Sequence, residues 1–330
     1  MTDQRQANET RRDNEDQHGG HQANEALQLL HQLSAKYQWV SVLQHASTLR
    51  MAEDDGSLKL LPHQQLHVAA YRILALLQTR QLERATAEIS ALGTLSEHNP
   101  KYRYESYAKL YAEARCGSFV PFCLHVVALE AAIRRGEAGA VDAIHAHAAR
   151  VSGVQRALLL SCAACAHARV GQMEASVEVV LQLVRENYNQ HALQTLSRAL
   201  LAVGDVECAT NVVDSVATRD ATLDALLSAV KGEYAEALAR YQSECGGGKT
   251  AVSNGAVCLL HLGRLEEAVR LVETAVLDGG EDVLDEGVLF NLATMYELAE
   301  PEGAAGKKSQ LANVASQRGR QGFDVQLLNR

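Results

Sequence analysis

Apolar side chains recur at intervals of three and four residues along most of the chain. The spacing is plainest early in the last quarter of the chain, where Leu259, Leu265, Val269, Val272 and Val276 fall on helical faces. We find no convincing run of alternating apolar and polar residues of the kind that forms a sheet. The pattern predicts an all-α protein.

A short turn followed by an amphipathic helix recurs through this helical pattern. The clearest copy is LGRLEEA, which begins at Leu262. The turn residues of the copies are Arg80, Gly136, Gly171, Gly204, Gly232 and Gly263. From Gly136 onward their separations are 35, 33, 28 and 31 residues. A period of about 34 residues with two helices in each unit is typical of tetratricopeptide repeats.

The residue types at fixed positions of the repeat agree with this interpretation. Glycine at the turn permits a tight backbone reversal, and Ala268 follows Gly263 where two helices must approach closely. One helix pair cannot bury its apolar face alone, so such units stack. We therefore predict a right-handed α-solenoid of tetratricopeptide-like helix pairs over residues 25–330. We assign structural repeat positions to Gly171, Gly204, Gly263, Ala268, Ala293 and Tyr296.

Two segments depart from the repeat. Residues 1–24 are almost wholly polar, and we expect a disordered tail there because such a composition cannot bury a core. Residues 93–121 interrupt the period with the sequence GTLSEHNPKYRYESYAKLYAEARCGSFVP. We expect an irregular insert in the solenoid at that point.

Composition and charge narrow the classes of function. The net charge of −9 gives no basic footprint for nucleic acid. No apolar run approaches the ~18 residues of a membrane span, so we expect no direct membrane insertion. The polar N-terminal stretch does not resemble a signal peptide, and we expect a cytoplasmic protein whose seven cysteines are reduced.

The stretch CGGGKT, residues 245–250, is similar to the end of a phosphate-binding loop. The full motif needs glycine five positions before Gly248, where this chain has Ser243, and it needs a strand before the loop. The stretch falls between two repeats instead. A nucleotide-binding enzyme is therefore the least favoured interpretation, and we expect no catalytic residue and no cofactor.

Cysteine and histidine residues do not form a metal-binding pattern. Cys162 and Cys165 are a Cys-x-x-Cys pair with His167 nearby, but no second pair follows, as a zinc ribbon would require. His145 and His147 are two residues apart on a helix and point to different faces. We interpret the cysteines as small packing residues and the histidines as ordinary surface or groove residues, and we expect no metal.

Three segments are distinctive: YESYAKLYAEARCGSFVPF (104–122), NGAVCLLHLGRLEEAVRLVE (254–273) and VLFNLATMYEL (288–298). Together they resemble the subunit 12 family of the transport protein particle (TRAPP) complex. The first weighs most, because generic repeats do not share it. The resemblance implies a non-catalytic scaffold in a vesicle-tethering complex that acts in ER-to-Golgi traffic and in autophagy.

The same resemblance implies the partners and the location. The partners would be other large TRAPP subunits such as 11, 13 and 8, and indirectly a Rab GTPase that the whole assembly activates. The protein would associate peripherally with ER–Golgi intermediate or Golgi membranes. The alternative is a repeat adaptor of another complex, such as a vesicle coat or a cargo receptor.

First-helix side chains line the concave groove of such a solenoid, where a partner peptide or helix binds. The predicted contact residues are Gln194, Arg198, Ser253, His261, Phe290 and Thr294. The groove lacks the lysine and asparagine set with which some repeat adaptors hold an acidic C-terminal peptide.

Overall fold

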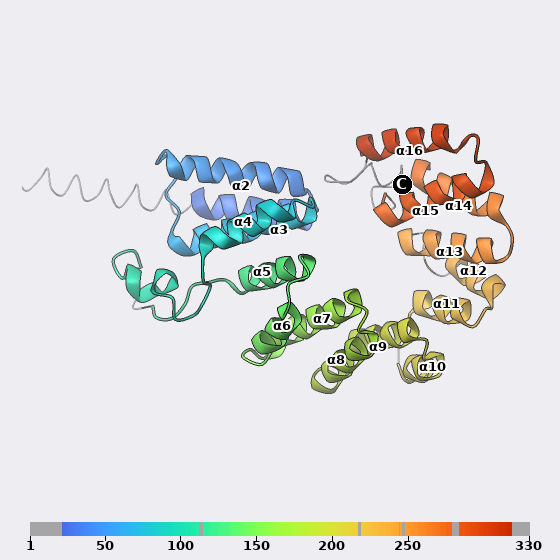
Figure 1. Cartoon of the computed structure of the whole chain (residues 1–330), viewed down its shortest axis with the longest axis horizontal. Helices are drawn as coiled ribbons and strands as arrows, with labels where there is room; N and C mark the ends of the chain where they lie inside the picture. The colour runs from blue at the N-terminus through green and yellow to red at the C-terminus, as the bar shows by residue number, and fades with distance from the viewer. Residues whose placement is uncertain are drawn as a thin grey trace, which may run out of the picture. The chain divides into compact units, whose positions relative to one another are not determined.

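The computed structural model describes residues 22–111, 115–216, 219–243, 245, 248–278 and 284–318. The chain divides into two compact units, Met1–Ala140 and Val141–Arg330 (Figure 1). Helices make up nearly all of the regular structure within the described ranges, where the only ladder contact is an isolated bridge between Arg103 and Ser118. The all-α fold predicted from the sequence is confirmed.

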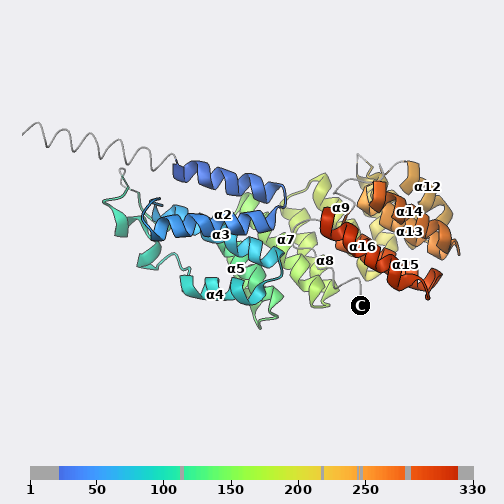
Figure 2. The same cartoon turned by 90° about the horizontal axis from the view of Figure 1, so that it is seen from above.

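The first unit consists of helices, with one long irregular segment between α4 and α5. Its elements are a helix over 22–35, α2 (Trp39–Asp54), α3 (Pro62–Gln78), α4 (Leu82–Leu92) and α5 (Phe122–Arg134). Helices α2 and α3 pack against each other, and α3 also packs against α4 and α5 (Figure 2). The first helix begins at residue 22, so residues 22–24 are helical and not part of a polar tail. The rest of that expected tail lies outside the described residues.

Two neighbouring clusters form the core of the first unit. Leu30, Val42 and Ala46 are fully buried in one of them, and Ile73 and Leu124 are fully buried in the other. α3 contributes to both clusters, because it carries apolar side chains on two faces. This helix is therefore the centre of the unit.

The segment after α4 is irregular. It contains two short 3₁₀ turns, η1 (Pro100–Tyr102) and η2 (Tyr104–Tyr107). Glu105 ties the segment together, because its carboxylate accepts hydrogen bonds from the guanidinium of Arg103 and from the backbone N–H of Gly117. These bonds, that of Arg103 first, lower the pKa of Glu105 to about 2. The Tyr111 hydroxyl lies 3.0 Å from His63 Nδ1, which anchors the insert to α3.

The second unit repeats helix pairs along its length (Figure 1). Its helices are α6 (Ala140–Ala148), α7 (Gly153–Arg169), α8 (Met173–Glu186), α9 (Gln190–Val203), α10 (Val206–Ser215), α11 (Ala221–Val230), α12 (Tyr234–Ser243), α13 (Lys249–His261), α14 (Leu265–Asp278), α15 (Glu286–Ala299) and α16 (Ala304–Arg318). From α7 onward each helix packs against the next one in sequence. This stacking of consecutive helix pairs is the architecture of a tetratricopeptide-type solenoid.

All six turn residues adopt the left-handed backbone conformation. Their φ angles are +59° at Arg80, +68° at Gly136, +80° at Gly171, +86° at Gly204, +85° at Gly232 and +74° at Gly263. At the last of these turns the N–H of Gly263 bonds to the carbonyl of Leu260, and the N–H of Arg264 to that of Leu259. At five of these turns, all except that of Gly136, only two or three residues separate the two helices, and the positive φ is what permits so short a reversal.

Small and aromatic side chains fill the contacts between the helices of a pair. Ala268 is fully buried, and Ala293 and Tyr296 are 3% and 6% exposed. These residues belong to one continuous core that runs from α11 to α16. The glycine and alanine positions of the repeat therefore have structural roles in the turn and in the helix contact.

Candidate protein-binding surfaces

The six predicted contact residues lie on three first helices of the second unit. Gln194 and Arg198 are on α9, Ser253 and His261 are on α13, and Phe290 and Thr294 are on α15. The first helices pack in the order α9, α11, α13 and α15. The α13 and α15 residues are therefore on neighbouring helices, and α11 separates the α9 pair from them.

The Arg198 side chain takes part in a contact between helices. One of its guanidinium nitrogens lies 2.8 Å from a carboxylate oxygen of Asp220. The other oxygen of Asp220 accepts hydrogen bonds from the backbone N–H groups of Thr222 and Leu223 at the start of α11. Arg198 thus stabilises the junction between α9 and α11, and a partner at this position would compete with Asp220.

The face shared by α13 and α15 carries exposed apolar side chains. The side-chain amide of Asn291 donates a hydrogen bond of 3.0 Å to the Ser253 hydroxyl and so links the two helices. Phe290 is 48% exposed, and Val257 on α13 is 40% exposed. The exposed Thr294 hydroxyl donates to the carbonyl of Phe290. We call Ser253, Val257, Phe290 and Thr294 the α13–α15 face.

His261 lies at the end of α13, where its ring stacks on that of Tyr234. The two rings are parallel, with centroids 4.2 Å apart. Tyr234 begins α12, so the stack joins consecutive repeats. The ring of His261 is therefore covered on one side by a neighbour within the chain.

The CGGGKT stretch is a connection between helices α12 and α13. Gly246 and Gly247 lie outside the described residues, and no strand is present in the described part of the chain before them. The Lys249 ammonium group lies 2.8 Å from a carboxylate oxygen of Asp285, at the start of α15. The lysine that a phosphate-binding loop would direct to a nucleotide is therefore in an ion pair between helices.

One contact between histidines was not foreseen. His145 Nε2 lies 3.1 Å from His167 Nε2, and His167 Nδ1 lies 2.8 Å from the side-chain oxygen of Gln172. The pKa of His145 is lowered by burial first and by the proximity of His167 second. Among the described residues, no three histidine, cysteine or acidic side chains gather into a possible metal site. The contact joins α6 to α7. Residue spacing within one helix could not predict it, because the two histidines lie on different helices.

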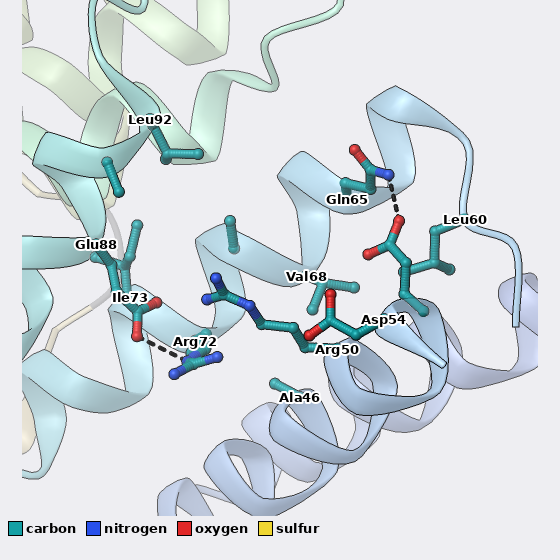
Figure 3. A pocket seen from close by; sticks show the side chains of 13 residues that line it. Ala46, Arg50, Asp54, Leu60, Gln65, Val68, Arg72, Ile73, Glu88 and Leu92 are labelled. Atoms are coloured by element: carbon teal, nitrogen blue, oxygen red, sulfur yellow. Dashed lines mark hydrogen bonds and ion pairs between the residues drawn. The ribbon is translucent and has the colours of Figure 1, made fainter. Parts of the chain in front are cut away.

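A cavity of about 350 Å³ lies in the first unit, between α2, α3 and α4 (Figure 3). Its apolar wall includes Ala46 and Ile73, which are fully buried. Its polar wall consists of Arg50, Glu53, Asp54, Gln65, Arg72 and Glu88. We call this the α2–α4 cavity. Sequence patterns could not predict this cavity, because nearly all of its residues come from three different helices, in each of which they fit an ordinary helical pattern.

None of the helices among the described residues is both long enough and apolar enough to cross a membrane. No protein-family profile matches the chain. Among solved structures, a tetratricopeptide repeat protein from Parabacteroides merdae is 13% identical with a TM-score of 0.41, covering 93% of this chain and 96% of that one. The Cut9–Hcn1 hetero-tetramer of the APC/C is 12% identical with a TM-score of 0.44, covering 92% of this chain and 55% of that one.

Two curated proteins are similar in sequence. Trafficking protein particle complex subunit 12 of Mus musculus is 27% identical over 306 residues, and the Homo sapiens protein of the same name is 26% identical over 307 residues. Each comparison covers 78% of this chain but only 38% and 41%, respectively, of the relative. The chain therefore spans well under half the length of these relatives. It is a tetratricopeptide-type helical-repeat protein that resembles subunit 12 of the trafficking protein particle complex.

Proposed function

We propose that this chain is a non-catalytic scaffold subunit of a tethering complex of the trafficking protein particle type. The observation that carries the proposal is the sequence similarity to subunit 12, which extends over 78% of the chain. A stack of helix pairs offers extended surfaces for protein contacts, which suits a scaffold. The irregular insert at 93–121 supports the same assignment, since a generic repeat protein does not need it.

In this proposal the chain binds other large subunits of the complex, such as subunits 11, 13 and 8. It acts on a Rab GTPase only indirectly, through an exchange activity that belongs to the assembly. The protein would work in ER-to-Golgi traffic and in autophagy, in the cytoplasm and at the surface of Golgi or intermediate-compartment membranes. The α13–α15 face supports this role, because exposed Phe290 and Val257 offer apolar contact area on neighbouring helices.

Affinity purification with mass spectrometry from native cells tests the proposal. The tagged chain should recover the other large subunits of a trafficking-particle complex. Replacing Phe290 by Asp should lower that recovery. Leu277→Asp should not, because Leu277 is at least as exposed (56% against 48%) but lies on the second helix α14. Recovery of coat or cargo-receptor subunits with no trafficking-particle subunit would refute the proposal and favour an adaptor of that other complex.

A further inference from the structure

The α2–α4 cavity has a polar wall in which two arginines from different helices take part. Arg50 comes from α2 and Arg72 from α3, and both side chains extend into the cavity (Figure 3). The floor beneath them is apolar and includes Ala46, Val68 and Ile73. A site with an apolar floor and a few converging polar groups is the usual composition of a ligand pocket.

Neither arginine has its hydrogen-bonding capacity satisfied within the described chain. Arg72 Nε lies 2.8 Å from a carboxylate oxygen of Glu88, but its N–H does not point at an acceptor. This nitrogen is fully buried, and the Arg72 side chain as a whole is 17% exposed. Arg50 forms no ion pair with any described side chain. Two guanidinium groups are therefore matched by one carboxylate at this end of the cavity.

The other acidic residues of the cavity do not close this imbalance. Glu53 accepts a hydrogen bond from Gln65. Gln65 and Leu60 lie at the opposite end of the cavity from Glu88 (Figure 3). Asp54 is exposed and does not form an ion pair with Arg50 within the described structure. The lining as a whole carries two guanidinium groups and three carboxylates, and both guanidinium groups lie toward the Glu88 end, away from the Gln65–Glu53 hydrogen bond (Figure 3).

We propose that the α2–α4 cavity binds an acidic segment of a partner protein, with an aspartate or glutamate side chain placed between Arg50 and Arg72. An apolar side chain next to that carboxylate would rest on Val68 and Ile73. Arginine suits this role because its planar guanidinium can donate two parallel N–H hydrogen bonds to the two oxygens of one carboxylate. The volume of about 350 Å³ lies at the small end of ligand pockets and fits one or two side chains of a peptide.

This site is separate from the α13–α15 face, which lies in the other unit. The proposal depends on the scaffold function in one respect only, namely that the ligand is part of a protein. A test on the isolated full chain therefore distinguishes failure of this site from failure of the proposed complex membership, which the purification experiment measures.

The test is a selection of random dodecapeptides displayed on phage against the full chain. Enriched peptides are synthesised and titrated by fluorescence polarisation against the natural chain and three variants. Arg50→Ala removes the unpaired guanidinium. Glu88→Gln removes the carboxylate that competes for Arg72 while keeping its shape. Arg84→Ala is the matched control, because Arg84 is an exposed arginine of α4 outside the cavity.

The enriched peptides should carry an aspartate or glutamate beside an aliphatic or aromatic residue. Arg50→Ala should weaken their binding by about tenfold or more, since it removes a charge-assisted hydrogen bond. Glu88→Gln should strengthen binding severalfold, a change that a damaged fold would not produce, and Arg84→Ala should leave it unchanged. A consensus without acidic residues, failure to enrich any sequence, or affinities that do not respond to Arg50→Ala would each overturn the proposal.

Discussion

Gly263 offers a direct test of the turn geometry that defines the repeat. Its φ of +74° lies in the region that side chains with a Cβ rarely adopt. A Cβ built at this position has no heavy atom within 4 Å, so replacement by alanine creates no clash with neighbouring side chains. The cost of Gly263→Ala is therefore a backbone cost alone.

The magnitude follows from two opposing terms. Placing a residue with a Cβ in the left-handed region costs about 1–2 kcal/mol. Alanine also restricts the unfolded chain, which returns about 0.4–1 kcal/mol. We therefore expect Gly263→Ala to lower the free energy of unfolding by about 1 kcal/mol, which corresponds to a fall of about 2–4 °C in the melting temperature. Gly263→Asn should cost less, because asparagine tolerates this conformation.

Thermal unfolding followed by circular dichroism or calorimetry measures these changes. The matched control is Gly306→Ala in α16, where the glycine is exposed, has ordinary helical backbone and has no heavy atom within 4 Å of an added Cβ. This control should be neutral or stabilising by up to about 1 kcal/mol, because alanine favours the helix. The reasoning is refuted if both replacements shift the melting temperature in the same direction and by the same amount.

Three further predictions concern packing and charge. Leu292→Ala removes a fully buried side chain from the core of the last repeats. In urea titrations it should lower the free energy of unfolding by about 2–5 kcal/mol. Phe290→Ala, on the exposed face of the same helix, should change that free energy little. Hydrogen bonds from Arg156 first and Gln182 second lower the pKa of Glu186 from 4.5 to about 2, so this carboxylate stabilises the fold above pH 4.5 and loses that effect as the pH falls toward 2. Because both side chains of the ion pair are partly exposed, Glu186→Gln should cost at most about 1 kcal/mol at neutral pH, and a melting-temperature deficit that persists unchanged at pH 2 would contradict this account. In an NMR titration the pKa of His145 should lie below the usual 6.5 of a histidine. His167→Gln should raise the pKa of His145 because it removes a neighbouring positive charge, while burial and Asp142 continue to act on His145. An equal rise of the His145 pKa in the His147→Gln control would contradict the pairing.

The sequence was sufficient for the repeat architecture because that architecture depends on local chemistry. Positive φ at a turn selects glycine, and close helix contact selects a small residue such as Ala268, so both leave a periodic trace in one chain. Even Arg80, which is not glycine, was located because a copy of the turn-and-helix pattern surrounds it, and it has φ +59°.

Side-chain partners were not predictable because they depend on how different helices are placed against each other. His145 and His167 are 22 residues apart and meet only through the packing of α6 on α7. Arg198 matched a groove position, yet it pairs with Asp220 on the following repeat. The α2–α4 cavity is similar: Arg50 and Arg72 each look like an exposed helical arginine, and only the approach of α2 to α3 places both in one cavity.

Direct reconstitution tests the central claim most sharply. The purified chain is mixed with the purified large subunits of a trafficking-particle complex, and the mixture is analysed by size-exclusion chromatography with light scattering. The account predicts that the chain elutes with those subunits in a complex of defined mass, and that Phe290→Asp reduces this fraction while Leu277→Asp does not. Elution of the chain at its own mass of 35.7 kDa, with no shift in the presence of any of those subunits, would contradict it.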